Sequence, residues 1–270
     1  MDISAHEPMA TAAEARELLE RGPLKVLGRL VDSSNSALVV TASGGDAELV
    51  AVYKPLAGER PLWDFPYETL AHREVATYDL SQALGWDLVP LTVWRDDGPA
   101  GPGMCQCWIE TDDPSGFISV FPLAEVPAGW HRILQGVGTD HEPLAVAHSD
   151  AAVLRQMAVL DVITNNADRK VGHILVDDGQ LVGIDHGVTF NIEPKLRTVL
   201  WGFSGKKLGS ELCETVERFV KDFDAHAPVL AAHLDADEIK VTRARARALL
   251  AAGKFPQPPT DGPAIPWPII

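Results

Sequence analysis

Cysteine is scarce in this sequence, which has three cysteines among 270 residues: Cys105, Cys107 and Cys213. A small, odd number excludes the disulfide framework that holds many secreted domains together. Cys105 and Cys107 stand two residues apart, so on a strand their side chains face the same side. A redox pair or half of a metal site would use that spacing, but small buried apolar residues use it more often. The cysteines therefore indicate a reducing compartment.

Long apolar runs are also missing. No apolar stretch approaches the roughly 18 residues that a membrane-spanning helix needs. The first ten residues contain neither the basic nor the apolar region of a secretory signal. Apolar residues still make up 46% of the chain, enough to bury a large core. We therefore expect a soluble, cytoplasmic, globular protein.

Positive charge is in short supply, with 23 Lys and Arg against 38 Asp and Glu, a net charge of −15. Such a surface repels nucleic-acid backbones and anionic lipid. We predict no nucleic-acid partner and no stable membrane association. The one locally basic stretch, residues 195–207, contains four cations that could hold an anionic substrate or remain solvated: Lys195, Arg197, Lys206 and Lys207.

The usual nucleotide-binding motifs are absent as well, since neither G-x-G-x-x-G nor a Walker A sequence occurs. A turn that contains Ser33, Ser34 and Asn35 joins two predicted strands instead. Hydroxyl groups and backbone N–H groups in such a turn can bind phosphates, so these three residues are candidate nucleotide contacts. The third predicted strand follows, and this meander of strands ends at Lys54.

Residues 160–191 organise the rest of the chain. Asp168 precedes His173 by five residues, and two short apolar runs around the turn at 177–179 predict a hairpin. Asp185 closes the second arm of that hairpin. A carboxylate on a loop, a ligand soon after it and a carboxylate ending the next strand form a layout typical of phosphoryl transfer.

The sequence N-A-D-R at 166–169, followed by I-D-H-G at 184–187, resembles the atypical kinases. It is similar in particular to type II phosphatidylinositol 4-kinases, to HipA toxin kinases and to an actinobacterial branch of phosphatidylinositol 3-/4-kinase-like proteins. Their pattern is N-x-D-R-x-x-x-N, then a strand ending in D-x-G, so His173 stands where the family has a metal-binding Asn. The resemblance implies ATP and Mg or Mn as cofactors, but it fixes no acceptor.

The resemblance also implies a fold. We expect an α+β, bilobal, protein-kinase-like chain whose small N-lobe has an antiparallel sheet and one helix, and whose C-lobe is mostly helical. Lys54 would contact the ATP phosphates and pair with Glu74 on a helix over 69–84, Glu68 being the alternative. Backbone groups near Trp108 and Ile109 would meet adenine.

Element and domain boundaries follow from turn signals and apolar periodicity. We place the N-lobe at 1–110, the C-lobe at 111–255 and a Pro-rich tail, docked or loose, at 256–270. Predicted strands cover 24–31, 37–41, 48–53, 88–94 and 104–110. Predicted helices cover 11–21, 151–163 with Asp150 as N-cap, 211–224 and 235–252, and residues 117–148 are expected to be irregular.

Each site residue has an expected role. Asp168 would orient or deprotonate the acceptor hydroxyl, and Arg169 would stabilise its loop or contact a phosphate. Asp185 and His173 are the metal candidates. Because imidazole suits Mn²⁺ better than Mg²⁺, His173 indicates a shifted metal preference, a single-metal site or a degraded one.

The leading hypothesis is an ATP-dependent phosphotransferase that moves the γ-phosphate to a lipid, protein or small-molecule hydroxyl. One alternative is a catalytically weak, nucleotide-binding pseudokinase that serves as a regulatory or interaction module. Another is a nucleotidyl (AMP) transferase, which would use the same lysine and metal.

Overall fold

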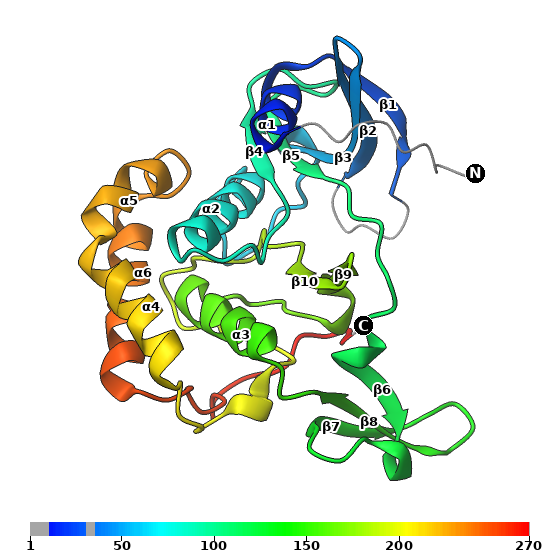
Figure 1. Ribbon diagram of the computed structural model, residues 1–270, viewed down its shortest axis with the longest axis vertical. Coiled ribbons are helices and arrows are strands. Elements are labelled where there is room, and N and C mark those ends of the chain that lie inside the picture. Colours follow the sequence, from blue (N-terminus) through cyan, green and yellow to red (C-terminus); the bar gives the residue numbers. More distant parts are fainter. Residues whose placement is uncertain (1–10, 31–35, 270) are drawn as a thin grey trace.

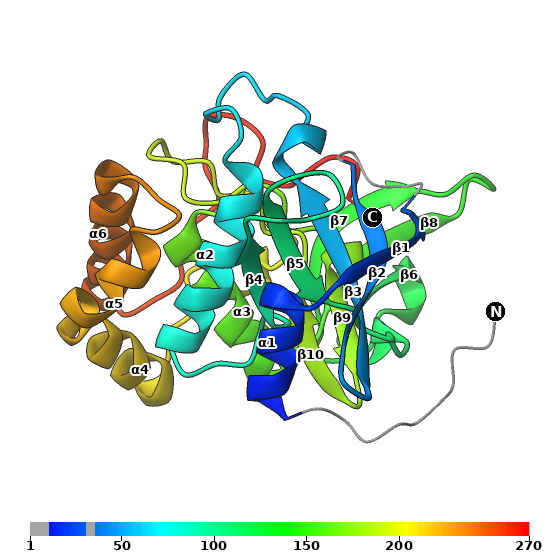
Figure 2. The ribbon, with the colours of Figure 1, turned by 90° about the horizontal axis from the view of Figure 1, so that it is seen from above.

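The computed structural model describes residues 11–30 and 36–269 of an α+β chain (Figure 1). One part consists of a five-stranded antiparallel sheet with helices against it, and the other is mostly helical (Figures 1 and 2). Across these described ranges, no helix has the length and apolar character needed to cross a membrane.

The five-stranded sheet confirms the predicted meander and has the order β1-β2-β3-β5-β4. The side chains that this sheet buries in its core include Val40, Tyr53 and Cys105. Cys105 is fully buried there, in agreement with a packing role. The strands are β1 (Leu24–Arg29), β2 (Leu38–Gly44), β3 (Ala47–Pro55), β4 (Thr92–Arg95) and β5 (Gly103–Cys107).

Two helices pack on this sheet, α1 (Ala12–Arg21) and α2 (Leu70–Ala83), so the sheet carries one helix more than the expected N-lobe. A capping box begins α1, because Thr11 and Glu14 each accept a hydrogen bond from the other's backbone N–H group. Leu18 and Leu19 then bury α1 against the sheet.

The first turn of α2 is capped by a residue that lies outside the helix, in the preceding loop. Thr69 makes no side-chain cap. The carboxylate of Glu59 accepts hydrogen bonds from the backbone N–H groups of Leu70 (3.1 Å) and Ala71 (2.7 Å) instead. A carboxylate at this end also complements the helix dipole, so the loop before α2 fixes where the helix begins.

Residues 117–148 are not irregular, and that expectation was wrong. They form a second antiparallel sheet of order β6-β8-β7, from β6 (Ile118–Pro122), β7 (His131–Val137) and β8 (Pro143–His148). Pro and Gly disfavour strand interiors, but here they stand where a sheet accommodates them. Pro122 ends β6, Pro143 begins β8, and Gly136 lies in an edge strand.

The hairpin predicted around residues 177–179 is present as β9 (Ile174–Asp177) and β10 (Gln180–Gly183). The helices of this part are α3 (Ala152–Thr164), α4 (Ser210–Lys221), α5 (Phe223–Leu230) and α6 (Ala236–Ala252). They share one large apolar core with the hairpin and the end of α2.

Two details of these helices differ from expectation. Asp150 does not cap α3, since Ala151 occupies the cap and Asp150 pairs with Arg155 at 2.6 Å. The helix predicted over 211–224 ends at Lys221, and α5 follows it with Pro228 inside. α5 was not predicted; it buries Phe223 and Leu230 although it contains Pro228.

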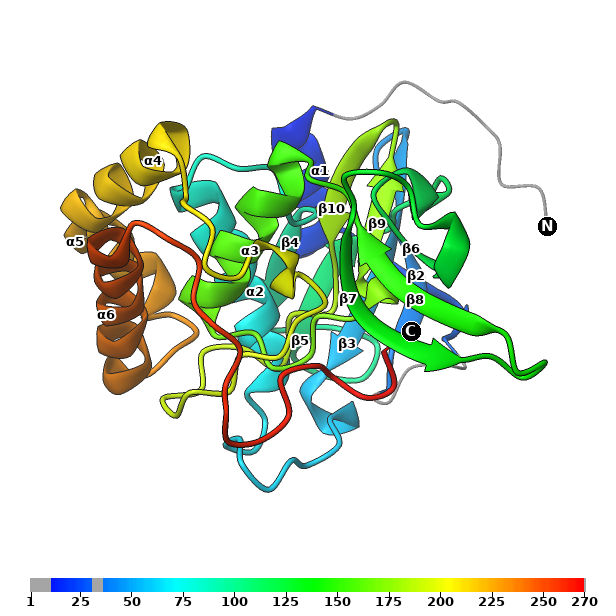
Figure 3. The ribbon, with the colours of Figure 1, turned by 90° about the horizontal axis from the view of Figure 1, so that it is seen from below.

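The Pro-rich tail is docked rather than loose, and it runs beneath the helical part (Figure 3). The Ala264 carbonyl accepts hydrogen bonds from Thr198 N (3.1 Å) and Trp201 Nε1 (2.6 Å). The Ile269 carbonyl accepts one from Val171 N at 3.0 Å. The tail therefore touches the loop that carries Asp168 and the segment that follows the hairpin.

Candidate active site

Three of the predicted residues meet in one cluster. Lys54, at the end of β3, donates to Glu74 on α2 (2.7 Å) and to Asp185 after β10 (2.8 Å). Burial alone would lower the pKa of Lys54, but the two carboxylates outweigh it and raise that pKa. The ammonium is therefore charged and fixed, and Glu74 rather than the exposed Glu68 is its helix partner.

Asp185 lies beside His173, with 3.3 Å between Oδ2 and Nε2. The positive charge of Lys54 holds the pKa of Asp185 well below its usual range, so this group is a carboxylate. Its φ of +58° is unusual for a residue other than glycine, and 42% of its side chain is exposed. Such backbone strain is typical of functional positions.

His173 and Asp185 together fit a divalent metal. Burial lowers the pKa of His173 to about 4, so its ring is neutral and able to act as a ligand. No cluster of three or more His, Cys, Asp or Glu able to hold a metal occurs in the described part of the chain. Phosphate oxygens and water would have to complete the coordination shell, as they do at many Mg²⁺ sites.

Asp168 lies on the loop after α3, half-buried, with its backbone N–H bonded to Asn166 Oδ1 at 2.9 Å. Burial raises the pKa of Asp168, and Lys170, 3.1 Å away, opposes part of that rise. The side-chain amide of Asn165 donates to the Asn191 carbonyl at 2.9 Å, and that of Asn166 donates to Asp161 Oδ1 at 3.0 Å, so both amides fix the loop.

The placement of Arg169 favours the loop-stabilising role over contact with a phosphate. Its side chain is completely buried and bonded to Asp161 on α3, with Nη2 2.9 Å and Nε 3.1 Å from Oδ1. Asp161 also accepts a hydrogen bond from Thr198 (3.0 Å). A guanidinium without solvent exposure has no path to a substrate, so Arg169 is a positioning residue.

The remaining nucleotide contacts stay predictions. Trp108 and Ile109 follow β5, and Trp108 N donates to Val50 O at 3.0 Å. The segment then continues to the bridge between Asp112 and Val176, where the two parts of the chain meet. Ser33, Ser34 and Asn35 lie outside the described residues.

Sequence reasoning gave no individual role to Lys170 or Arg197. Arg197 lies beside the Asp168 loop because its N–H donates to Asn166 O (2.9 Å) and its carbonyl accepts from Arg169 N (3.1 Å). The only signal in the sequence was the basic composition of residues 195–207. Which of those cations faces the loop depends on tertiary contacts.

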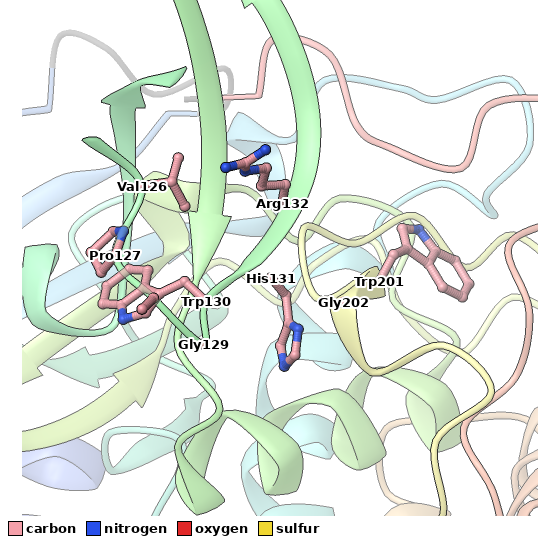
Figure 4. Close-up of a pocket in the computed structure, with 9 residues that line it drawn as sticks. Val126, Pro127, Gly129, Trp130, His131, Arg132, Trp201 and Gly202 are labelled. Carbon is pink, nitrogen blue, oxygen red and sulfur yellow. The ribbon is translucent and has the colours of Figure 1, made fainter. Parts of the chain in front are cut away.

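A pocket of about 580 Å³ opens elsewhere, between β7 and the turn at Trp201 (Figure 4). Trp130, His131 and Arg132 line one side of it, and Trp201 with Gly202 the other. None of the predicted site residues lines this pocket.

The chain was compared with known proteins. No family model matches it. The protein Rv2133c of Mycobacterium tuberculosis is 41% identical over 271 residues, which cover 96% of this chain and 97% of that protein. This chain belongs to the family of Rv2133c.

One solved structure shares the fold at low identity. Hydra Fam20, solved with a sugar, superposes with a TM-score of 0.51 and 12% identity over 90% of this chain and 89% of its own. The Helicobacter pylori proinflammatory kinase CtkA superposes with a TM-score of 0.49 and 10% identity, over 88% of this chain and 94% of its own. The chain has a bilobal, kinase-like fold. Membership of the type II phosphatidylinositol 4-kinase and HipA group stays a prediction.

Proposed function

We propose that this protein is a metal-dependent phosphotransferase of the atypical kinase type, which moves the γ-phosphate of ATP to a hydroxyl acceptor. The observation that supports this most is the contact of Lys54 with both Glu74 and Asp185. In kinases the Lys–Glu pair and the metal-binding Asp must both be in place for transfer.

The roles follow from this placement. Lys54 would neutralise phosphate charge, and Asp185 with His173 would hold the metal. A bound divalent metal would stabilise the charge that develops on the phosphate oxygens. The acceptor oxygen bonds to the γ-phosphorus, the bond from that phosphorus to the bridging oxygen of ADP breaks, and Asp168 takes the hydroxyl proton.

The first test is the thermal stability of the purified chain with ATP and Mg²⁺ or Mn²⁺. Because a ligand that binds the native state stabilises it, we expect a metal-dependent rise in Tm that Asp185→Asn abolishes. A larger rise with Mn²⁺ would support His173 as a ligand. No rise with either metal would contradict the proposed nucleotide site.

A nucleotide-binding role without transfer is the second candidate, because His173 replaces the family's Asn and places an imidazole beside Asp185 where the family has an oxygen ligand, which Mg²⁺ prefers. We predict that Asp168→Asn keeps the ATP-dependent rise in Tm and slows ADP formation about 10²–10⁴-fold. Wild-type protein that binds ATP but forms no ADP with a broad acceptor panel would favour this candidate. A mass increase corresponding to AMP in an acceptor would indicate nucleotidyl transfer instead.

We also propose that the lobes divide near residue 110. Trp108 donates a backbone hydrogen bond to Val50 of the five-stranded sheet, and four residues later Asp112 donates one to Val176 of the hairpin. Limited proteolysis should cut first between these two residues if the lobes move as units. Initial cleavage within a lobe would count against this boundary.

A further inference from the structure

Two cations flank Asp168, the proposed acceptor-facing carboxylate. Lys170 pairs with it at 3.1 Å and keeps 20% of its side chain exposed. Arg197 is half-buried on the segment whose backbone bonds to the Asp168 loop on both sides. One carboxylate next to two cations leaves an excess of positive charge in a chain whose net charge is −15.

Arg197 is held in place by its backbone, not by its side chain. Its N–H and carbonyl bond to Asn166 and Arg169, yet its guanidinium makes no hydrogen bond or ion pair within residues 11–30 and 36–269. Ordering a partly buried guanidinium without a partner costs free energy. A ligand whose oxygen atoms accept hydrogen bonds from the guanidinium would offset that free-energy cost.

Other cations of the same basic stretch are already engaged. Lys195 pairs with Asp64 at 2.9 Å and lies over the ring of Trp63. Lys206 contacts His131 at 2.6 Å, on the side of the second sheet. Arg197 therefore differs from both in having its charge available beside Asp168.

We propose that Arg197 and Lys170 form an anion-binding subsite for the acceptor, which would be a hydroxyl compound that carries a phosphate group. The inference rests on the proposed phosphotransferase function and specifies its acceptor. A guanidinium can donate two parallel hydrogen bonds to a phosphate, and an ammonium adds a point charge. Binding the phosphate there would hold a neighbouring hydroxyl near Asp168.

The test measures Tm of the full chain in the presence of ADP and Mn²⁺, with inorganic phosphate, glycerol 3-phosphate or glycerol added. We expect both phosphates to raise Tm and glycerol to leave it unchanged. Arg197→Gln should weaken phosphate binding at least about 10-fold, the loss of a charged hydrogen bond. The matched control Lys207→Gln, a charge removed from the same stretch, should behave like wild type.

A second arm identifies where the phosphate comes from. Vesicles of phosphatidylglycerol in phosphatidylcholine should sediment with wild-type protein but not with Arg197→Gln if the group belongs to a lipid headgroup. Binding of glycerol 3-phosphate without sedimentation would indicate a soluble acceptor. Both results require Arg197 and so support the subsite.

Three outcomes overturn the inference. Wild-type protein that responds to ATP but not to either phosphate has no anion subsite, while its proposed function survives. An ATP response lost in Arg197→Gln would assign the guanidinium to the nucleotide instead. Absence of any ATP response in wild-type protein would overturn the proposed function and the subsite with it.

Discussion

At the scale of single residues, Asp161 on α3 holds the loop that carries Asp168 in place. Its two oxygens accept bonds from Arg169, Asn166 and Thr198, three residues from separate parts of the loop and the following segment. Both members of the Asp161–Arg169 pair are almost fully buried. Removing one member of a buried ion pair leaves the other charge buried without a partner, and this destabilises the folded state.

We therefore predict that Asp161→Ala lowers the free energy of unfolding by about 3–5 kcal/mol, as measured by urea denaturation. The control is Asp224→Ala, which breaks the pair with Arg243, where the Asp side chain is 80% exposed. That exposed pair should contribute less than about 1 kcal/mol. Equal losses in the two variants would contradict a special role for Asp161.

At the scale of elements, α2 is fixed to both parts of the molecule. Arg73 bonds to Glu238 on α6 and to the Thr189 carbonyl at 2.5 Å, and its side chain is 1% exposed. The neighbouring Glu74 faces the other way, toward Lys54. The buried Arg73–Glu238 pair thus holds α2 where Glu74 reaches the lysine.

We predict that Arg73→Met leaves Glu238 without its partner, lowers the unfolding free energy by about 3–5 kcal/mol and speeds hydrogen exchange in α2. Arg243→Met is the matched control, because it breaks the pair between α6 and Asp224 on α5, where the Asp side chain is 80% exposed. Unchanged exchange in α2 of the Arg73 variant would show that other contacts position the helix.

Elements with strong local signals could be predicted from sequence. The Thr11 capping box and the turn at 177–179 are such signals, and both elements are present. Lys54 and Asp185 could be paired only through the kinase resemblance, because 131 positions separate them. The Glu59 cap and the charge of Arg197 beside Asp168 depend on contacts between distant segments, so no local sequence pattern indicates them.

At the scale of the whole molecule, acid should destabilise the fold through its buried imidazoles. Burial lowers the pKa of His148 and of His233 from 6.5 to about 4. Between these values the unfolded chain binds protons that the folded chain excludes, so stability rises with pH. The contribution is complete above about pH 6.5 and is lost as pH falls toward 4.

We expect urea denaturation to give an unfolding free energy that decreases steadily from pH 7 to pH 4, with about 3 kcal/mol of the change from His148. His148→Gln should flatten the profile by that amount, because its amide does not titrate there. The same slope in wild type and variant would assign the acid sensitivity to other groups.

The docked tail has a consequence for how the protein is made. Chains emerge from the ribosome beginning at the N-terminus, and domains often fold during synthesis. Val171, three residues after Asp168, is bonded to Ile269. The loop of the candidate site can therefore gain this backbone contact only after residue 269 has been synthesised and has docked, long after the loop itself has left the ribosome.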